Sequence, residues 1–384
     1  MTRIGFLPLR KGSKGIPNKN KRKMVGRPLF TWVLGEALFS NLDKIYVYTD
    51  DEAIVEFINR EYQWTDKVEA MIRSAQTATD TASTESAILE FCARIDYNFE
   101  VFCLLQATSP FTTRTDINKC LDVISDTNAS ALTVVKTHRF TWNPDGTPSN
   151  YEVFNRPRRQ DFDGLLIENG AVYATTKVSL QETKNRIGNT VAMVEMPEAS
   201  LHEIDSETDW LVVEQLLMDR QKKQKTSDKI THLVLDVDGV FTAGTITYGK
   251  DGELSKEFDM RDGMGLEILR EQGVEVMVMT SEQSEIVAQR MKKLKIADVF
   301  LGVKDKFSRL QHIIHDRNLS LQNIAYMGDD VNDLANICSV GWSLTPNNAT
   351  PIVKQHADII VPKDSGNGAI RAACQFILNY NKRF

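Results

Sequence analysis

Short apolar runs alternate with longer amphipathic stretches along most of the chain, and this alternation restricts the possible folds more than any other feature. Stretches such as PLFTWVLGEALFS and SEIVAQRMKKLK have the periodicity of helices. The apolar runs have the length of strands and lie at 3–9, 44–49, 101–107, 130–135, 233–237, 274–280, 298–302, 323–328 and 358–361. Strands that alternate with helices predict parallel sheets covered on both faces. We therefore predict an α/β protein with two doubly wound, Rossmann-like parallel-sheet domains.

The length of 384 residues also favours two domains, because one hydrophobic core rarely serves so long a chain. The segment MDRQKKQKTSDK, residues 218–229, is highly charged and has no large apolar residue after Met218. It lies between a helical pattern and a new apolar strand, so we interpret it as a helix end followed by a linker. We predict domains at 1–226 and 227–384. The alternative is a solvated surface helix within one domain.

Composition excludes several classes of protein. The net charge of -6 argues against extensive binding to nucleic acid or to a membrane surface. The five cysteines are scattered without a CxxC pair, which argues against a disulfide framework and a zinc site. No apolar run approaches about 20 residues, and the start of the sequence lacks the pattern of a secretory signal. We expect a cytoplasmic protein.

A basic loop follows the first predicted strand, in the sequence GFLPLRKGSKGIPNKNKRK. Seven lysines or arginines lie between Arg10 and Lys23, with no acidic residue among them. Gly12 and Gly15 permit tight turns, and backbone N–H groups in such a loop form a cradle for an anion. Arg10, Lys14 and Lys19 add positive charge. The loop therefore predicts a phosphate site, with a solvated charged loop as the alternative.

Two aspartates follow the first predicted strand of the second half, in LVLDVDGVF. Side chains at i and i+2 share one face of a strand, so Asp236 and Asp238 project together. Such close carboxylates suit a divalent cation, and they also suit a division of labour between nucleophile and proton carrier. A solvated strand end is the alternative. Further polar groups follow two later strands or precede a helix, namely Thr280, Ser281, Lys306, Asp329, Asp330 and Asp333.

The first half resembles the CMP-sialic acid synthetases over residues 3–217, on the ordered motifs LRKGSKGIPNKN, TDTAST, LLQATSPF, RPRRQD, ENGAVYA and EIDSETDW. In that family a sugar acid attacks the α-phosphorus of CTP and pyrophosphate leaves. With the loop residues above, the resemblance implies nucleotide binding by Arg10, Gly12, Ser13, Lys14, Lys19, Asn20, Arg73, Asp80, Thr81 and Ser83, with Arg10 and Lys19 also catalytic. It implies sugar contacts by Gln106, Arg159, Gln160, Asp161 and Asn169. Glu203 and Asp205 fall where the family has two metal-handling aspartates.

The second half resembles the small haloacid-dehalogenase-superfamily phosphatases of 3-deoxy-ulosonates over residues 230–381. The resemblance implies that Asp236 is the nucleophile, Asp238 the general acid/base, and Thr280 and Lys306 the groups that neutralise the phosphoryl group. It implies Mg²⁺ held by Asp236, the backbone carbonyl of Asp238, and Asp329, with Asp330 supporting Lys306 or the metal shell. Glu282 and Lys293 fall where nonulosonate 9-phosphatases carry a Glu and a Lys that contact the sugar. The family is typically tetrameric.

Together these resemblances predict a bifunctional enzyme that removes the 9-phosphate from a nonulosonic acid phosphate and couples the free acid to CMP. Its partners would be CTP, the acid and the acid's 9-phosphate, and its cofactor Mg²⁺. We expect a homotetramer formed through the phosphatase domain, with dimers of the synthetase domain. The alternatives are a second domain that serves only assembly, an eight-carbon 3-deoxy-octulosonate substrate, and a protein that binds nucleotide without catalysis.

Overall fold

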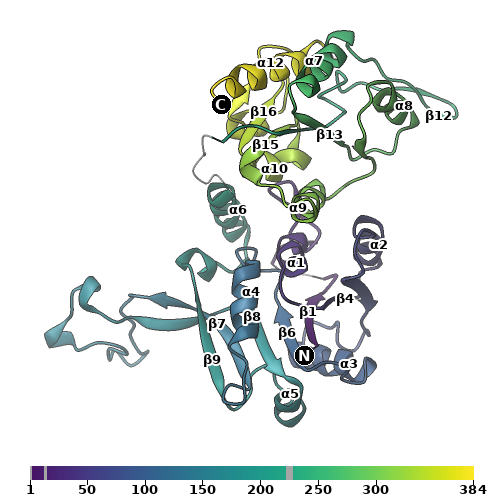
Figure 1. The fold of residues 1–384 in the computed structure, drawn as a ribbon. Helices are drawn as coiled ribbons and strands as arrows, with labels where there is room; N and C mark the ends of the chain where they lie inside the picture. The colour runs from purple at the N-terminus through teal and green to yellow at the C-terminus, as the bar shows by residue number, and fades with distance from the viewer. Residues whose placement is uncertain (1, 13–14, 222–227) are drawn as a thin grey trace. The chain divides into compact units, whose positions relative to one another are not determined.

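The computed structural model describes residues 2–12, 15–221 and 228–384, and its chain divides into two compact units (Figure 1). The amino-terminal unit comprises Met1–Arg22 and Pro28–Val213, and the carboxyl-terminal unit comprises Lys23–Arg27 and Glu214–Phe384. The predicted boundary at residue 226 lies outside the described residues, so it stays a prediction.

The amino-terminal unit is built on a seven-stranded sheet. Its strands are, in spatial order, β5 (Val68–Ile72), β4 (Lys44–Thr49), β1 (Arg3–Leu9), β6 (Val101–Leu105), β8 (Leu165–Thr176), β7 (Ser130–Thr137) and β9 (Val191–Met196). The pairs are parallel except that β8 runs antiparallel to both β6 and β7. The central β1 and β6 end beside each other, which brings the loops that follow them together.

Alternate residues of these strands pack into separate cores on the two faces of the sheet. Leu7 of β1 and Cys103 of β6 belong to the core on one face, whereas Phe6 and Phe102 belong to the core on the other. Parallel strands that are buried on both sides need such continuous apolar sequence. The helices are α1 (Phe30–Leu38), α2 (Glu52–Glu61), α3 (Thr84–Arg94), α4 (Arg114–Asp122), α5 (Lys177–Thr183) and the first part of α6 (Glu207–Gln221), which from Glu214 belongs to the carboxyl-terminal unit.

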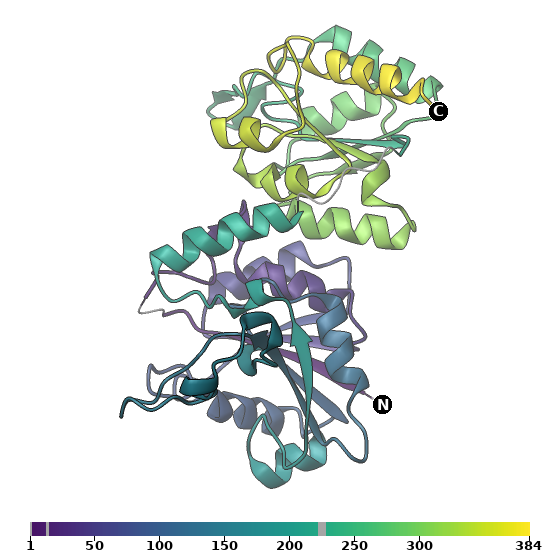
Figure 2. The same ribbon diagram turned by 90° about the vertical axis from the view of Figure 1, so that its left-hand side faces the viewer.

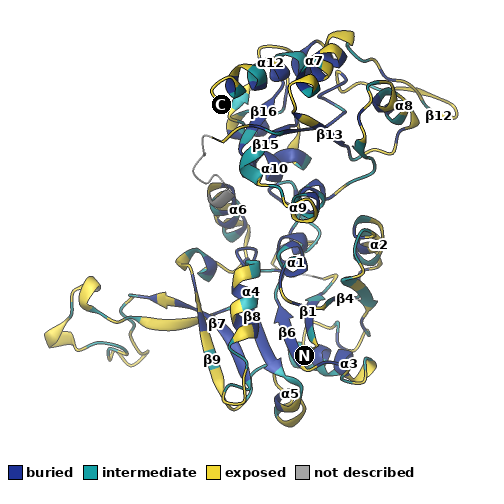
Figure 3. Cartoon of the chain, viewed as in Figure 1, coloured by how far each residue is buried: buried dark blue, intermediate teal, exposed yellow. Residues whose placement is uncertain are grey.

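An excursion between β7 and β8 leaves the body of this unit and is largely exposed (Figure 3). Trp142 and Phe154 are exposed, whereas Phe140 packs on Tyr151 and Phe162. Two 3₁₀ turns lie in it, η1 (Val153–Asn155) and η2 (Arg159–Asp161).

The carboxyl-terminal unit has a six-stranded, wholly parallel sheet. The spatial order is β14 (Asp298–Phe300), β13 (Glu275–Met279), β10 (His232–Leu235), β15 (Ile324–Met327), β16 (Trp342–Thr345) and β17 (Ile359–Ile360). Because β13, β10 and β15 are neighbours, the polar residues that follow these three strands meet at one edge of the sheet.

Helices cover the sheet of this unit, and α7 and α12 pack against each other (Figure 2). The helices are α7 (Met260–Glu271), α8 (Glu285–Lys293), α9 (Lys306–Asp316), α10 (Leu334–Ser339), α11 (Pro351–His356) and α12 (Ala369–Asn381). A small hairpin of β11 (Thr247–Gly249) and β12 (Gly252–Ser255) lies between β10 and α7 in the chain. Two further short strands, β2 (Lys23–Met24) and β3 (Arg27–Pro28), and the turns η3 (Glu198–Leu201), η4 (Leu321–Asn323) and η5 (Val331–Asp333) complete the elements.

The prediction of an α/β fold with doubly wound sheets is confirmed. The antiparallel placement of β8 departs from the predicted parallel sheet, because β8 pairs with β7 by folding back after the excursion and not through a helical crossover. In the described ranges, no helix has both the length and the apolarity needed to cross a bilayer.

Candidate active sites

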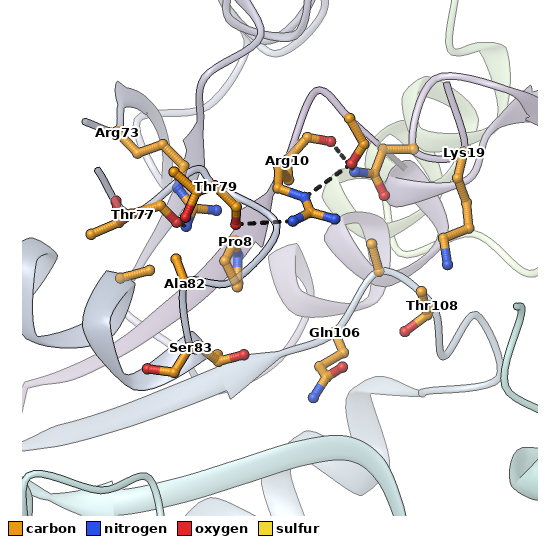
Figure 4. Close-up of a pocket in the computed structure, with 15 residues that line it drawn as sticks. Pro8, Arg10, Lys19, Arg73, Thr77, Thr79, Ala82, Ser83, Gln106 and Thr108 are labelled. Atoms are coloured by element: carbon orange, nitrogen blue, oxygen red, sulfur yellow. Dashed lines mark hydrogen bonds between the residues drawn. The ribbon is translucent and has the colours of Figure 1, made fainter. Parts of the chain in front are cut away.

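A cavity of about 260 Å³ opens at the carboxyl ends of β1 and β6 in the amino-terminal unit (Figure 4). Its lining brings together sequence-predicted residues from four separate motifs, namely Arg10, Gly12, Lys19, Asn20, Arg73, Ser83 and Gln106. Ser13 and Lys14 lie outside the described residues, so their predicted nucleotide contacts stay predictions. The cavity is therefore the candidate nucleotide site.

Arg10 connects the basic loop with the loop that contains Asp80 and Thr81. Its Nε donates to the carbonyl oxygen of Gly12 at 3.0 Å, and its Nη1 donates to the carbonyl of Thr79 at 3.0 Å. The same Nη1 lies 2.9 Å from Oδ1 of Asp80. Figure 4 shows the guanidinium between Thr79 and Lys19. This arrangement places one fixed positive charge in the cavity.

Lys19 lies beside the acidic motif at 203–205. Its Nζ donates to the carbonyl of Ile204 at 2.7 Å and lies 3.6 Å from Oδ1 of Asp205. A Cβ on Gly15 would lie 2.1 Å from the carbonyl oxygen of Asp205, so only glycine permits this close approach. Burial and the charge of Asp205 raise the pKa of Glu203, although Lys19 opposes the shift. Lys19 and the two predicted metal-handling carboxylates are thus neighbours.

Arg73 lines the cavity and is largely buried, and this desolvation lowers the pKa of its guanidinium. One guanidinium nitrogen donates to the carbonyl of Thr77, while Nε has no hydrogen-bond partner in the described part of the chain. An unpartnered buried donor costs free energy unless a ligand satisfies it. This geometry suits a residue that contacts a bound nucleotide.

Glu90 of α3 anchors the loop that follows Arg73, and sequence reasoning missed it. Its carboxylate accepts hydrogen bonds from Tyr48 Oη (2.5 Å), Ser74 N (3.0 Å), Ser74 Oγ (2.7 Å) and Thr77 Oγ1 (2.6 Å). Burial opposes its ionisation, but bonds from Thr77, Tyr48 and Ser74 outweigh this and lower the pKa of Glu90 from 4.5 to about 2. The partners are distant in sequence, and no motif marks them.

The predicted sugar-binding residues of this unit fall in different places. Gln106 lines the cavity. Gln160 and Asp161 lie on the exposed turn η2, where Asp161 Oδ2 lies 2.8 Å from Nε of Arg158, and the side chain of Arg159 lies outside the described part.

Two of the residues predicted to bind nucleotide lie at or near the start of α3. Ser83 caps this helix by accepting from Ser86 N, and Thr81 is exposed nearby.

The prediction that Asn169 binds sugar is not supported by its surroundings. The side chain is buried, its Oδ1 accepts from Thr133 Oγ1 at 2.7 Å, and its Nδ2 donates to Ser200 Oγ at 3.0 Å. Both ends of the amide are therefore occupied inside the unit. Asn169 ties β8 to β7 and to η3, which is a structural role.

Three carboxylates meet at the edge of the second sheet. One oxygen each of Asp236, Asp329 and Asp333 lie within 4.8 Å of one another. Asp236 follows β10, Asp329 follows β15, and Asp333 ends the turn η5. A Cβ on Gly239 would lie 2.0 Å from Asp329 Oδ2, and Gly239 has a φ of +86°. Glycine is thus required for this close approach.

Lys306 lies among these carboxylates at the start of α9. Its Nζ lies 2.8 Å from Asp236 Oδ1 and 2.8 Å from Asp333 Oδ1, and Tyr326 Oη donates to the same Asp333 oxygen at 2.6 Å. All four side chains are buried. Burial opposes the charge of Lys306, but Asp236 and Asp333 more than compensate and raise its pKa. The site therefore holds a fixed ammonium beside the predicted nucleophile.

The geometry fits a divalent cation. Burial and the charge of Asp333 raise the pKa of Asp236, and the same two effects raise that of Asp329 to about 7. Asp329 Oδ1 is buried without a hydrogen-bond partner among the described residues. Carboxylate oxygens that repel one another and lack donors are the ligands that Mg²⁺ uses. The side chain of Asp238 contacts Lys256 through Oδ1, and its backbone carbonyl stays a predicted metal ligand.

Thr280 and Ser281 follow β13 beside this group. Thr280 is buried, and Asn332 Nδ2 of the turn η5 donates to Ser281 Oγ at 3.2 Å. Asp330 is exposed and accepts from Val331 N, whereas Lys306 donates to Asp333, so Asp333 supports Lys306 in the place predicted for Asp330. The other predicted role of Asp330, support of the metal shell, stays a prediction. Lys306 lies between Asp236 and Asp333, deeper than the loop segment that contains Asp330.

Glu282 and Lys293, the two residues predicted to favour a nine-carbon sugar, have different neighbours. Glu282 is exposed and pairs with Lys304 at 3.0 Å. Lys293 is at the end of α8 and lines a shallow cavity with Met264 and Arg290. Their roles in sugar recognition stay predictions.

Comparison with known proteins agrees with these two sites. Residues 4–157 match the cytidylyltransferase family model, and residues 280–372 match that of haloacid dehalogenase-like hydrolases. An N-acylneuraminate cytidylyltransferase B of Danio rerio is 30% identical over 393 residues, covering 99% of this chain and 91% of that protein. The 3-deoxy-D-manno-octulosonate 8-phosphate phosphatase of Escherichia coli K12 is 32% identical over 152 residues, covering 40% of this chain and 81% of that protein.

Among solved structures, the Moraxella catarrhalis 3-deoxy-D-manno-octulosonate 8-phosphate phosphatase, in complex with magnesium ion, phosphate ion and KDO, is 30% identical with a TM-score of 0.39. It covers 44% of this chain and 94% of that one. The sequence relationship to the Danio rerio enzyme extends over both units. The chain therefore belongs to the N-acylneuraminate cytidylyltransferase family, and it combines a cytidylyltransferase domain with a haloacid dehalogenase-like hydrolase domain.

Proposed function

We propose that the chain is a bifunctional enzyme that hydrolyses a nonulosonate 9-phosphate and then couples the free acid to CMP. One observation carries this proposal beyond cytidylyl transfer. The carboxyl-terminal unit retains a group of Asp236, Asp333 and Lys306, all buried, together with the half-buried Asp329. Buried charges are costly to maintain, so a unit that served only assembly would have no need of them.

In the amino-terminal unit, the anomeric hydroxyl of the sugar acid attacks the α-phosphorus of CTP. A bond from the sugar oxygen to phosphorus forms and the hydroxyl proton passes to water, while the bond from the α-phosphorus to the bridging oxygen breaks and pyrophosphate leaves with the electron pair. Negative charge grows on the phosphate oxygens, and Arg10, Lys19 and Arg73 supply positive charge around the cavity. Glu203 and Asp205, which lie near Lys19, would hold Mg²⁺, and the ion would add positive charge at the phosphates.

In the carboxyl-terminal unit, a carboxylate oxygen of Asp236 attacks phosphorus and forms an aspartyl phosphate. The bond from phosphorus to the sugar oxygen breaks, and that oxygen takes its electron pair and a proton from Asp238. Water then attacks the phosphorus, returns a proton to Asp238, and releases phosphate and the free Asp236 carboxylate. Lys306 and Thr280 neutralise the phosphoryl oxygens. Mg²⁺, held by Asp236, Asp329 and the carbonyl of Asp238, would supply further positive charge.

The relatives of the carboxyl-terminal unit support a second substrate candidate. The Escherichia coli protein, named for 3-deoxy-D-manno-octulosonate 8-phosphate, resembles 40% of this chain. An eight-carbon sugar acid phosphate is therefore the rival to the nine-carbon substrate that Glu282 and Lys293 favour.

A substrate panel separates these candidates. N-acetylneuraminate 9-phosphate, KDN 9-phosphate and 3-deoxy-octulosonate 8-phosphate are each offered with CTP and Mg²⁺ while phosphate and pyrophosphate are followed. We expect both products from at least one 9-phosphate and more slowly from the octulosonate. Asp236→Asn removes phosphate release and leaves pyrophosphate release from the free acid. A wild-type chain that releases pyrophosphate but no phosphate from any of the three would refute the bifunctional proposal.

We further propose a cytoplasmic homotetramer formed through the phosphatase units, with pairs of synthetase units. The exposed Trp142 and Phe154 on the excursion favour an intersubunit contact there. Sedimentation velocity of the whole chain tests this, and a monomer at micromolar concentration would contradict it.

A further inference from the structure

Lys256 is a buried cation beside the predicted proton carrier of the phosphatase site. It directly follows the strand β12, and its side chain is 0% exposed. Its Nζ donates to Asp238 Oδ1 at 2.5 Å and lies 3.2 Å from Glu253 Oε1. Removing an ammonium from water is costly unless the partner carboxylates are held in good geometry, so this contact is a specific one.

The two oxygens of Asp238 have different surroundings. Oδ1 accepts from Lys256 at 2.5 Å and from Thr242 Oγ1 at 3.5 Å. Oδ2 is buried and has no hydrogen-bond partner within the described ranges. One oxygen therefore fixes the orientation of the carboxyl group, while the other is left to meet a ligand.

Lys256 is itself held from the opposite side. Glu253 Oε1 contacts its Nζ, and Glu253 Oε2 accepts a hydrogen bond from Ser284 Oγ. Ser284 is the N-cap of α8, where its Oγ also accepts from Val287 N at 3.3 Å. A polar chain thus extends from the start of α8 through Glu253 and Lys256 to Asp238. Glu253 lies on β12 and Lys256 directly follows it, whereas Ser284 caps α8 and Asp238 follows β10, so the chain joins three separate parts of the unit.

We propose that Lys256 is a positioning residue that orients the Asp238 carboxyl group so that Oδ2 faces the oxygen of the departing sugar. This inference rests on the proposed phosphatase function. The charged contacts of Lys256 are with Asp238 and Glu253, so it acts on the reaction through Asp238. Its loss should therefore matter most when the leaving oxygen needs a proton.

The leaving group provides the test. A sugar alkoxide is a strong base and departs only with a proton, whereas 4-nitrophenolate departs without one. We expect Lys256→Met in the full chain to lower kcat/KM about 100-fold for the panel sugar phosphate that the wild type hydrolyses fastest, because general acid catalysis contributes about 100-fold or more. The loss with 4-nitrophenyl phosphate should be less than about 10-fold, since no proton is needed. Asp238→Asn should show the same contrast.

Three controls keep the outcomes distinct. Lys250→Met removes a lysine from the exposed turn of the same hairpin and should match the wild type. Lys256→Arg keeps the cation and should restore part of the kcat/KM for the sugar phosphate that Lys256→Met loses. Retained hydrolysis of 4-nitrophenyl phosphate reports that the phosphatase unit of each variant has folded, and pyrophosphate release reports the same for the amino-terminal unit. Equal losses on both substrates, or no loss beyond that of Lys250→Met, would overturn the role of Lys256 alone. A wild type inactive on every phosphate would refute the phosphatase proposal itself.

Discussion

At the scale of single residues, the sequence predicts the chemistry that is encoded locally. The pair Asp236 and Asp238 on one strand end and the glycine that follows them are neighbours in sequence, so their geometry follows from strand periodicity. Lys256 and Glu90 meet partners 18 and 16 residues away through tertiary folding, and no short pattern marks them. The burial of Asn169 and its hydrogen bonds within the unit are likewise not visible in its motif, and its sugar contact stays a prediction that these bonds do not support.

The contact between Lys306 and Asp333 predicts that Asp333→Asn is far more harmful than Asp330→Asn. Asp333 is fully buried and accepts from both Lys306 and Tyr326, so its loss leaves Lys306 with one buried carboxylate. Breaking such a pair costs about 3 to 5 kcal/mol. We expect phosphate release to fall at least about 100-fold and the melting temperature to drop by about 5 °C or more. Asp330→Asn should stay within about threefold of wild type.

Calorimetry and phosphate release on the two variants measure this difference. The substitutions are chemically identical and three residues apart, so each controls for the other. Comparable losses in the two variants would contradict the placement of Lys306 against Asp333.

The buried amide of Asn169 predicts a change in stability without a change in sugar affinity. Asn169→Ala leaves Thr133 and Ser200 without their buried partner, which costs about 1 to 3 kcal/mol. The KM for the sugar acid in pyrophosphate release should stay within about twofold of wild type. Gln106→Ala, which alters the lining of the cavity, should raise that KM without the same loss of stability. A raised KM in Asn169→Ala at unchanged melting temperature would restore the original prediction of sugar contact.

At the scale of elements, periodicity predicts β1, β4, β6 and β7 because they are long and apolar. The direction of β8 does not follow from its sequence. Direction depends on whether the preceding segment crosses the sheet or folds back, and the segment between β7 and β8 contains no helix in its described residues apart from two 3₁₀ turns. The alternation of strands with helices therefore predicts the fold class, whereas the direction in which β8 pairs depends on tertiary packing.

Glu90 connects α3, β4 and the loop that contains Thr77, so Glu90→Gln should loosen that loop and the Arg73 beside it. We expect the KM for CTP to rise about tenfold, a change of about 1.4 kcal/mol, with a smaller change in kcat. Glu56→Gln, on the exposed face of α2, is the matched control and should leave the KM unchanged. Steady-state pyrophosphate release measures both.

The same carboxylate predicts a dependence of stability on pH. The folded pKa of Glu90 is about 2 and lies below its ordinary value of 4.5, so its stabilising effect is present above about pH 4.5 and is lost as the pH falls towards 2. Urea unfolding followed between pH 7 and pH 3 should show the wild type and Glu90→Gln converging as the pH falls. A difference in unfolding free energy that is constant over this range would contradict the assigned pKa.

At the scale of the whole molecule, the two candidate sites lie in different units and share no residue. We therefore predict that they can be inactivated separately. Lys19→Met should lower pyrophosphate release at least about 100-fold, as the loss of a charge that stabilises the transition state does, and leave phosphate release within about twofold. Asp236→Asn should abolish phosphate release and leave pyrophosphate release within about twofold. Loss of both activities in either variant would contradict independent sites.

The repulsion among Asp236, Asp329 and Asp333 predicts stabilisation by Mg²⁺. A ligand that binds only the folded state at 100 times its Kd adds about 2.7 kcal/mol. We expect the melting midpoint of the carboxyl-terminal unit to rise by a few degrees with millimolar Mg²⁺ and to fall again with EDTA. In Asp329→Asn the rise should be largely lost. An equal shift in that variant would place the cation elsewhere.

The presence of both pockets on a single polypeptide has a metabolic corollary. Every copy of one catalyst arrives with a copy of the other, so a cell cannot adjust their relative abundance through expression. Under the proposed function, the amount of free sugar acid that accumulates between the two steps would then be set by the turnover numbers and saturation of the two halves.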